Sequence, residues 1–146
     1  MTVDDPFDLQ RFVLAQAPVF DAVCAELAAG DKRSHWMWFV FPQLAALGRS
    51  QTALHFGLRS REEALAYAGH ALLGERLRHC TRLVLHAAPG RSAHEVFHSP
   101  DDLKFRSCMT LFGAVRPDEP VFGQALARFF ESRPDARTLE LLGPGL

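Results

Sequence analysis

The sequence predicts an all-α fold, a single compact multi-helix domain of about seven or eight helices with at most a trace of strand. Helix start signals recur along the chain, and the apolar residues between them follow mostly helical spacing. No long run alternates apolar with polar residues, and no Asn-Gly pair marks a hairpin. With 146 residues and no internal repeat or low-complexity linker, we expect residues 1–146 to form one domain with a full hydrophobic core.

The first helical run is expected to extend from Asp5 to Gly30. Asp5 is predicted as the N-cap, Pro6 as the first helical residue, and Gly30 as the stop. The Ala17-Pro18 step should divide this run into two helices or kink it, because proline lacks a backbone donor and clashes with the preceding turn.

The middle of the chain carries two capping boxes, in which a serine is followed three residues later by glutamate. They lie at residues 60–63 and 92–95 and predict a helix start at each. Between them, Ala71–Ala87 has apolar residues at near-helical spacing, which predicts a helix. His55–Leu58 is the one segment interpreted as a short extended piece.

The C-terminal part predicts three more helices. Residues 99–102 read as a variant capping box with Ser99 as the cap, and Glu119-Pro120 opens the next helix. A last short helix is expected over residues 136–142. Gly113 and Gly123 fall inside helical patterns, where we expect them to permit close helix packing.

Composition and charge narrow the classes of partner. The chain has 16 basic and 17 acidic residues, a formal net charge of -1, so we expect no nucleic-acid polymer and no anionic membrane as partner. No segment is long and apolar enough to span a bilayer, and the N-terminus lacks a signal-peptide pattern. The three cysteines lack a C-x-x-C pattern, so the chain is expected in the reducing cytoplasm.

The segment Lys32–Gln43 is the first candidate wall of a binding site. It contains both tryptophans of the chain and one of its two lysines. In a helix Trp36 and Trp38 would point about 200° apart, whereas in a strand they would share a face. A buried central helix is the alternative interpretation. A site would use an indole to stack on a ring, and an anion would lie beside the basic residues at a helix N-terminus. The ligand-binding candidates here are Lys32, Arg33, Trp36, Trp38 and Gln43.

The segment Ser99–Phe112 is the second candidate wall. On a helix Lys104 and Ser107 share one face, with Asp101 a turn earlier. Such a set can bind phosphate or sugar hydroxyls, although an ordinary capped helix with a surface ion pair would also explain it. We therefore take Lys104, Asp101 and His35 as catalytic candidates, the histidine because it titrates near neutral pH, and Ser107 as a further ligand-binding candidate.

Metal and cofactor signals are weak. His94 and His98 have the i, i+4 spacing of metal ligands on a helix, but no third ligand follows at an interpretable distance. The sequence also lacks a Walker loop, a G-x-G-x-x-G fingerprint and a G-x-S-x-G elbow. We expect no bound metal and no cofactor.

Several motifs resemble one known family, the domain of unknown function 1810, whose members are small, mainly helical bacterial proteins that are sometimes mislabelled calpastatin. The segments that carry the resemblance are Phe7–Val13, Lys32–Phe39, Phe41–Gln43, Leu73–Leu77 and Asp101–Phe112. The chain departs from the family pattern at His70–Gly74, where the proline of His-Pro-Val-Leu-Gly is absent. The resemblance implies an α-helical fold and no established activity.

Two functional hypotheses follow. The first is an enzyme or binder acting on a nucleotide- or ADP-ribose-like small molecule. The D-x-x-K…M pattern, with tryptophans elsewhere, is distantly similar to N-glycosidases that process ADP-ribose-like nucleosides. The alternative is a non-enzymatic protein-interaction or oligomerisation module, in which the aromatic segment packs on a partner such as a second copy of the chain. The first hypothesis requires Lys32–Gln43 and Asp101–Phe112 to form two walls of one site.

Overall fold

The computed structural model describes residues 4–87 and 90–143 and confirms the all-α prediction. The described residues form the helices α1 (Gln10–Gln16), α2 (Phe20–Ala28), α3 (Met37–Val40), α4 (Gln51–Phe56), α5 (Arg61–Gly69), α6 (Leu73–His86), α7 (Ala93–Phe97), α8 (Asp101–Val115), α9 (Pro120–Phe130) and α10 (Ala136–Leu142), with a 3-10 turn, η1 (Ala45–Leu47). Three of them, α3, α4 and α7, have only four to six residues, which explains why the number exceeds the expected seven or eight.

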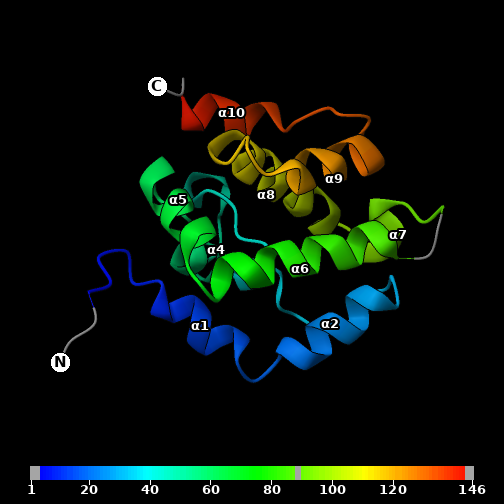
Figure 1. The fold of residues 1–146 in the computed structure, drawn as a ribbon, viewed down its shortest axis with the longest axis horizontal. Coiled ribbons are helices and arrows are strands. Elements are labelled where there is room, and N and C mark those ends of the chain that lie inside the picture. Colours follow the sequence, from blue (N-terminus) through cyan, green and yellow to red (C-terminus); the bar gives the residue numbers. More distant parts are fainter. Residues whose placement is uncertain (1–3, 88–89, 144–146) are drawn as a thin grey trace.

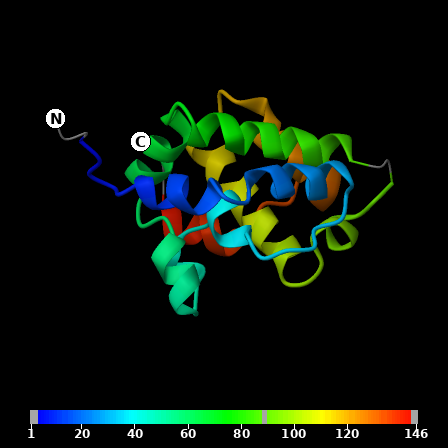
Figure 2. The ribbon, with the colours of Figure 1, turned by 90° about the horizontal axis from the view of Figure 1, so that it is seen from below.

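The long helix α6 runs through the middle of the molecule (Figure 1). Helices α1 and α2 lie on one side of it, and α8, α9 and α10 lie on the other (Figure 1). Helix α6 packs on α2, α5 and α9, whereas α8 packs on α5, α7, α9 and α10. Seen from below, the α3–α4 region lies beneath α1 and close to the start of α8 (Figure 2). This arrangement brings the two candidate segments to one part of the fold.

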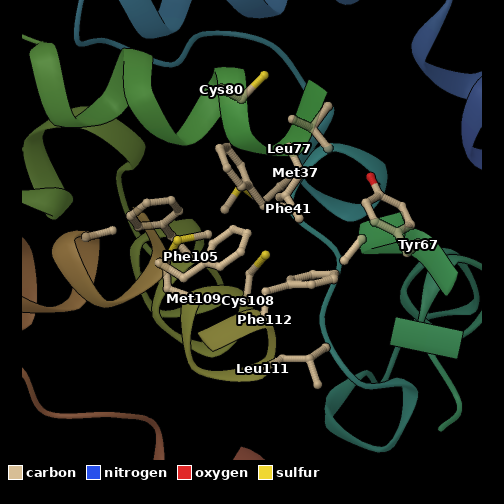
Figure 3. Close-up of a cluster of buried hydrophobic side chains, with 14 of the residues drawn as sticks. Met37, Phe41, Tyr67, Leu77, Cys80, Phe105, Cys108, Met109, Leu111 and Phe112 are labelled. Atoms are coloured by element: carbon tan, nitrogen blue, oxygen red, sulfur yellow. The ribbon is translucent and has the colours of Figure 1, made fainter. Parts of the chain in front are cut away.

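Apolar side chains from α1, α2, α7 and α9 as well as from α3, α5, α6 and α8 form the core. Figure 3 shows a cluster of these side chains. Phe105 of α8 is fully buried and lies 5.0 Å from the ring of Phe41 and 4.6 Å from that of Phe97. Burial of each such ring contributes roughly 1.5–3 kcal/mol. Phe105 therefore packs the end of the Lys32–Gln43 segment and α7 against the first turns of α8.

Two buried polar side chains anchor α3 within this core. Gln16, at the end of α1, is 1% exposed and donates from Nε2 to the carbonyl oxygen of Phe39 over 2.6 Å. The same amide nitrogen donates to the hydroxyl of Tyr67 over 3.1 Å. Burial raises the pKa of Tyr67 far above its ordinary value, so this hydroxyl stays neutral.

Several helix boundaries match the sequence prediction. The run from Asp5 to Gly30 is broken at Pro18 into α1 and α2, and Pro120 is the first residue of α9. Ser92 forms a complete capping box with Glu95. Ser60 accepts from the Glu63 amide as predicted, but the Glu63 carboxylate turns to Arg59 N and the Arg11 side chain instead.

Three boundary predictions were wrong. Helix α1 begins at Gln10 rather than near Asp5, because Asp8 has a positive φ of 52° that interrupts the helix. The Asp5 carboxylate still caps this end by accepting from the amides of Leu9 and Gln10. The first residue of α8 is Asp101 and its N-cap is Pro100, so Ser99 lies too early to cap the helix.

The third correction concerns the predicted extended piece at 55–58. His55 and Phe56 belong to α4, and only the following residues are extended. Leu58 forms an isolated parallel bridge with Leu44, the trace of strand that the sequence allowed for. At Gly57 a Cβ atom would lie 2.4 Å from the Ala45 Cα, so only glycine permits this close approach.

Candidate ligand-binding site

The structure brings the two candidate segments together around a pocket of about 340 Å³. One wall comes from the loop before α3 and from α3 itself, and the other from the α7–α8 turn and the first turn of α8. Six of the nine predicted site residues line this pocket: Lys32, Arg33, His35, Trp38, Asp101 and Lys104. The two lysines of the chain thus reach one site from opposite walls.

The loop before α3 is held in place by the carboxylate of Glu26, on α2. Glu26 accepts from the backbone amides of Arg33 and Ser34 at 2.8 and 3.0 Å, and from the Ser34 hydroxyl. The Trp36 indole nitrogen donates to the same carboxylate over 3.0 Å. Partial burial alone would raise the pKa of Glu26, but these hydrogen bonds outweigh it and lower the pKa from 4.5 to about 2.

Lys32 is buried, with 7% of its surface exposed. Its Nζ lies 2.9 Å from the Oδ2 of Asp101 and 4.9 Å from the ring centroid of Trp36, and it donates to the Ser34 carbonyl. The Lys32 backbone amide donates to the Val96 carbonyl over 2.7 Å, which ties the loop to α7. An ammonium this deep in the protein needs its carboxylate partner, because an unpaired buried charge is costly.

Lys104 is the more accessible of the two lysines, with 25% of its side chain exposed. Its Nζ lies 3.7 Å from the Oδ1 of Asp101 and 5.4 Å from the ring centroid of Trp38. Asp101 therefore stands between the two ammonium groups, with the closer contact to Lys32. Because Lys104 is only loosely paired, it can turn toward an anion in the pocket at little cost.

The two tryptophans have different environments. Trp36 is 1% exposed, packs beside Phe41 and does not line the pocket, so its role as a ligand-stacking ring is not supported by its position. Trp38 is partly exposed and lines the pocket beside Lys104. Neither periodic geometry considered for the segment applies throughout, because Trp36 precedes the single turn of α3 and Pro42 follows it.

Gln43 and Ser107 lie outside the pocket. Gln43 lines a much smaller neighbouring cavity of about 10 Å³, which shares Met37, Trp38 and Lys104 with the main pocket. Ser107 is 8% exposed, and its hydroxyl donates back to the Leu103 carbonyl one turn earlier. The expected anion site at a helix N-terminus behind Lys32–His35 is also unsupported, since α3 has only four residues and a correspondingly small dipole.

Further charge pairs connect the elements next to the pocket. Asp31 pairs with Arg33 at 2.9 Å and with the Nε2 of His98 at 3.0 Å, which links the loop to the α7–α8 turn. Hydrogen bonding from His98, with Arg33 nearby, lowers the pKa of Asp31. His94 pairs with Asp102 at 3.4 Å. Over residues 4–87 and 90–143, no three His, Cys, Asp or Glu side chains gather as a metal site would require.

Comparison with known proteins identifies the family. The family model described as "Protein of unknown function (DUF1810)" matches residues 6–142. The chain belongs to this family. Among solved structures, the chain is similar to the conserved hypothetical protein Rv1873 from Mycobacterium tuberculosis, with 54% sequence identity and a TM-score of 0.92. The match covers 94% of this chain and 98% of that one. No curated protein matches the chain.

Two residues that organise the site in this DUF1810 protein escaped the sequence prediction. Glu26, on α2, lies 7 to 10 residues before the groups that it holds, and Gln16, on α1, lies 23 residues before Phe39. Nothing in the local pattern distinguishes either residue from a surface position. The apolar residues around them predict that they lie on helices but do not predict which groups they hydrogen-bond. In the part of the chain that the structure describes, no helix has the length and apolar character of a membrane span.

Proposed function

We propose that the pocket between α3 and α8 binds a small anionic ligand with a planar ring, of the nucleotide or ADP-ribose kind. The convergence of Lys32, Lys104, Arg33 and Trp38 on one pocket supports this proposal. Three cations and one carboxylate line the pocket, and Asp31, which pairs with Arg33, lies next to it. The remaining excess of positive charge favours an anion. The volume of about 340 Å³ lies at the lower end of the range for small-molecule sites.

The ligand groups are assigned to the residues by their chemistry and exposure. Trp38 offers a partly exposed indole face for stacking on a ring. Lys104 and Arg33 are the cations that a phosphate can reach, because both side chains are more exposed than that of Lys32. The phosphate would draw Lys104 away from its 3.7 Å contact with Asp101.

A narrower version of the proposal is hydrolysis of an N-glycosidic bond. The three catalytic candidates Asp101, His35 and Lys104 line the same pocket, and this favours a reaction there. A carboxylate can stabilise an oxocarbenium-like transition state, and a neutral histidine can activate water. The test is release of free base from AMP or ADP-ribose over hours, with the Asp101→Asn protein as control.

Fewer observations support the alternative function, a protein-interaction or oligomerisation module. Trp36, Met37, Val40 and Phe41 are buried in the chain's own core, which leaves Trp38 and Phe39 as the partly exposed aromatic residues of the segment. Of the aromatic rings in this segment, a second copy or another protein would reach only those two. Measuring the mass of the protein in solution over a hundredfold range of concentration tests self-association directly.

The binding proposal is tested by calorimetry and tryptophan fluorescence with AMP, ADP-ribose and ribose 5-phosphate. We expect binding in the micromolar to millimolar range and quenching of Trp38 by the two ligands that carry a base. Trp38→Phe should abolish most of the quenching, and Lys104→Ala should weaken binding about tenfold or more, the usual effect of losing a charged hydrogen bond.

Arg137→Ala is the matched control for a lost cation, since Arg137 is 60% exposed on α10 and does not line the pocket. The affinity of this variant for AMP and ADP-ribose should equal that of the unchanged protein. A ligand present at 100 times its dissociation constant should also stabilise the fold by about 2.7 kcal/mol. If none of the three compounds binds at millimolar concentration, the proposal is wrong.

A further inference from the structure

Lys32 is held by the protein and has little capacity left for a ligand. Its side chain is 6% exposed, and its ammonium is shared among the Asp101 carboxylate, the Ser34 carbonyl and the Trp36 ring. An ammonium has three donors, and these contacts occupy the directions in which they can point. Lys32 therefore serves to hold the Asp101 carboxylate in one orientation.

Asp101 has one oxygen engaged and one that retains accepting capacity. Oδ2 lies 2.9 Å from Lys32, whereas Oδ1 lies 3.7 Å from Lys104, beyond hydrogen-bond distance. Asp101 lines the pocket and its side chain is 18% exposed. A carboxylate oxygen with unused lone pairs accepts hydrogen bonds and donates none, so it favours a ligand group that carries a hydrogen.

A phosphate alone fits this arrangement poorly. It would gain from Lys104 and Arg33 but would be repelled by the Asp101 carboxylate a few ångströms away. A ligand that offers a phosphate to the cations and a hydroxyl to Oδ1 satisfies both groups at once. The ribose of a nucleotide supplies such hydroxyls at its 2′ and 3′ positions.

We propose that Asp101 accepts a hydrogen bond from a ribose hydroxyl of the ligand, so that the pocket selects ribonucleotide-like anions over equally charged anions without those hydroxyls. This inference rests on the proposed function, because it assumes a nucleotide-like ligand in the pocket. Lys32 then acts as a positioning residue, and Lys104 is the cation that the phosphate reaches.

The test compares the dissociation constants of AMP and 2′,3′-dideoxy-AMP, measured by calorimetry at pH 7. The two probes have the same base and the same phosphate and differ only in the two hydroxyls. We expect AMP to bind about tenfold or more tightly, the size expected for a hydrogen bond to a charged group. Inorganic phosphate should bind more weakly than either nucleotide.

Two variants locate the effect. In Asp101→Asn the ratio between the two probes should fall below about threefold, and the affinity for inorganic phosphate should rise because a repelling charge is gone. In Lys104→Gln both nucleotides should bind more weakly by a similar factor, so their ratio should stay as in the unchanged protein. Circular dichroism and melting curves establish that each variant is folded.

The outcomes separate the inference from the proposed function. If AMP and the dideoxy compound bind equally well, the pocket binds nucleotides but Asp101 does not select the hydroxyls, and only the inference fails. The same conclusion follows if a folded Asp101→Asn protein keeps the full ratio. If neither nucleotide, ADP-ribose nor phosphate binds, the proposed function fails and the inference fails with it. Because the ratio is measured first on the unchanged protein, poor folding of a variant cannot hide the answer.

Discussion

Four hydrogen-bond donors converge on the carboxylate of Glu26, and this convergence gives the loop before α3 its shape. The donors are the Arg33 and Ser34 amides, the Ser34 hydroxyl and the Trp36 indole nitrogen. Such charge-assisted bonds are stronger than bonds between neutral groups. They aim Trp36 into the core and leave Arg33 and His35 beside the pocket.

Replacing this carboxylate should destabilise the protein in a pH-dependent way. The pKa of Glu26 in the folded protein is lowered to about 2, below its ordinary 4.5. Its contribution to the free energy of unfolding is therefore complete above pH 4.5 and is lost as the pH falls toward 2. We expect Glu26→Gln to cost about 1–3 kcal/mol at pH 7. The difference from the unchanged protein should shrink between pH 4.5 and 2, measured by urea unfolding.

Glu140→Gln is a suitable control, because Glu140 is 73% exposed on α10 and forms only a long surface pair with Arg137. Its unfolding free energy should change by less than about 0.5 kcal/mol. A Glu26→Gln protein as stable as this control at pH 7 would contradict the role assigned to the carboxylate.

Among the elements, the start of α6 depends on a glycine whose role the sequence did not reveal. A Cβ atom at Gly74 would lie 2.1 Å from the Ala68 carbonyl oxygen of α5, so the two helices meet here through backbone. The sequence pattern predicts close packing at Gly113 and Gly123 instead. At Gly123 nothing lies within 4 Å of an added Cβ, and at Gly113 the nearest atom is an ordinary 3.7 Å away, so neither is required for packing.

Matched alanine substitutions distinguish these positions. Gly74→Ala should destabilise the protein by about 2 kcal/mol or more, because the α5 or α6 backbone must shift to relieve the clash. Gly123→Ala, inside α9, should be neutral or stabilising by up to about 1 kcal/mol, because alanine is the better helix former. Thermal unfolding of both variants measures the difference, and equal melting temperatures would refute the α5–α6 contact.

At the scale of the whole molecule, the reactivity of the buried cysteine thiols measures how tightly the helices pack over the core. Cys80 and Cys108 are fully buried and Cys24 is partly exposed. Burial raises the pKa of each of these thiols, and Asp21 adds to the effect on Cys24. The reactive thiolate is therefore scarce at neutral pH, and access to the two buried sulfurs requires the structure to open.

We expect one thiol, that of Cys24, to react first with a disulfide reagent at pH 8 in the folded protein. Cys80 and Cys108 should react at least about 1000-fold more slowly than in denaturant, in line with the unfolding free energy of an ordinary domain. The absorbance of the released reagent follows each step, and Cys24→Ser should remove the first one. Fast reaction of two or more thiols under native conditions would show that the core is looser than described.

The sequence alone predicted most helix positions, because their signals act over a few residues. The proline at 18 divides α1 from α2, Pro120 opens α9, and Ser92 caps α7 through its own neighbours. The predicted helix starts at Asp5 and Ser99 were wrong because the backbone there adopts a conformation that residue preferences do not determine. Asp8 with its positive φ is one such case.

The site depended on contacts that no local pattern contains. The sequence singled out both lysines and both tryptophans, and helical spacing placed Lys104 one turn after Asp101. Only packing brought Lys32 to the same carboxylate. Packing also buried Trp36 while leaving Trp38 at the pocket, a distinction that helical or strand periodicity did not make. Residue chemistry determines which groups can pair, and the packing of helices far apart in sequence determines which of them come into contact. An unpaired charge becomes costly only when the packed helices bury it, so this energy is absent from the local sequence pattern.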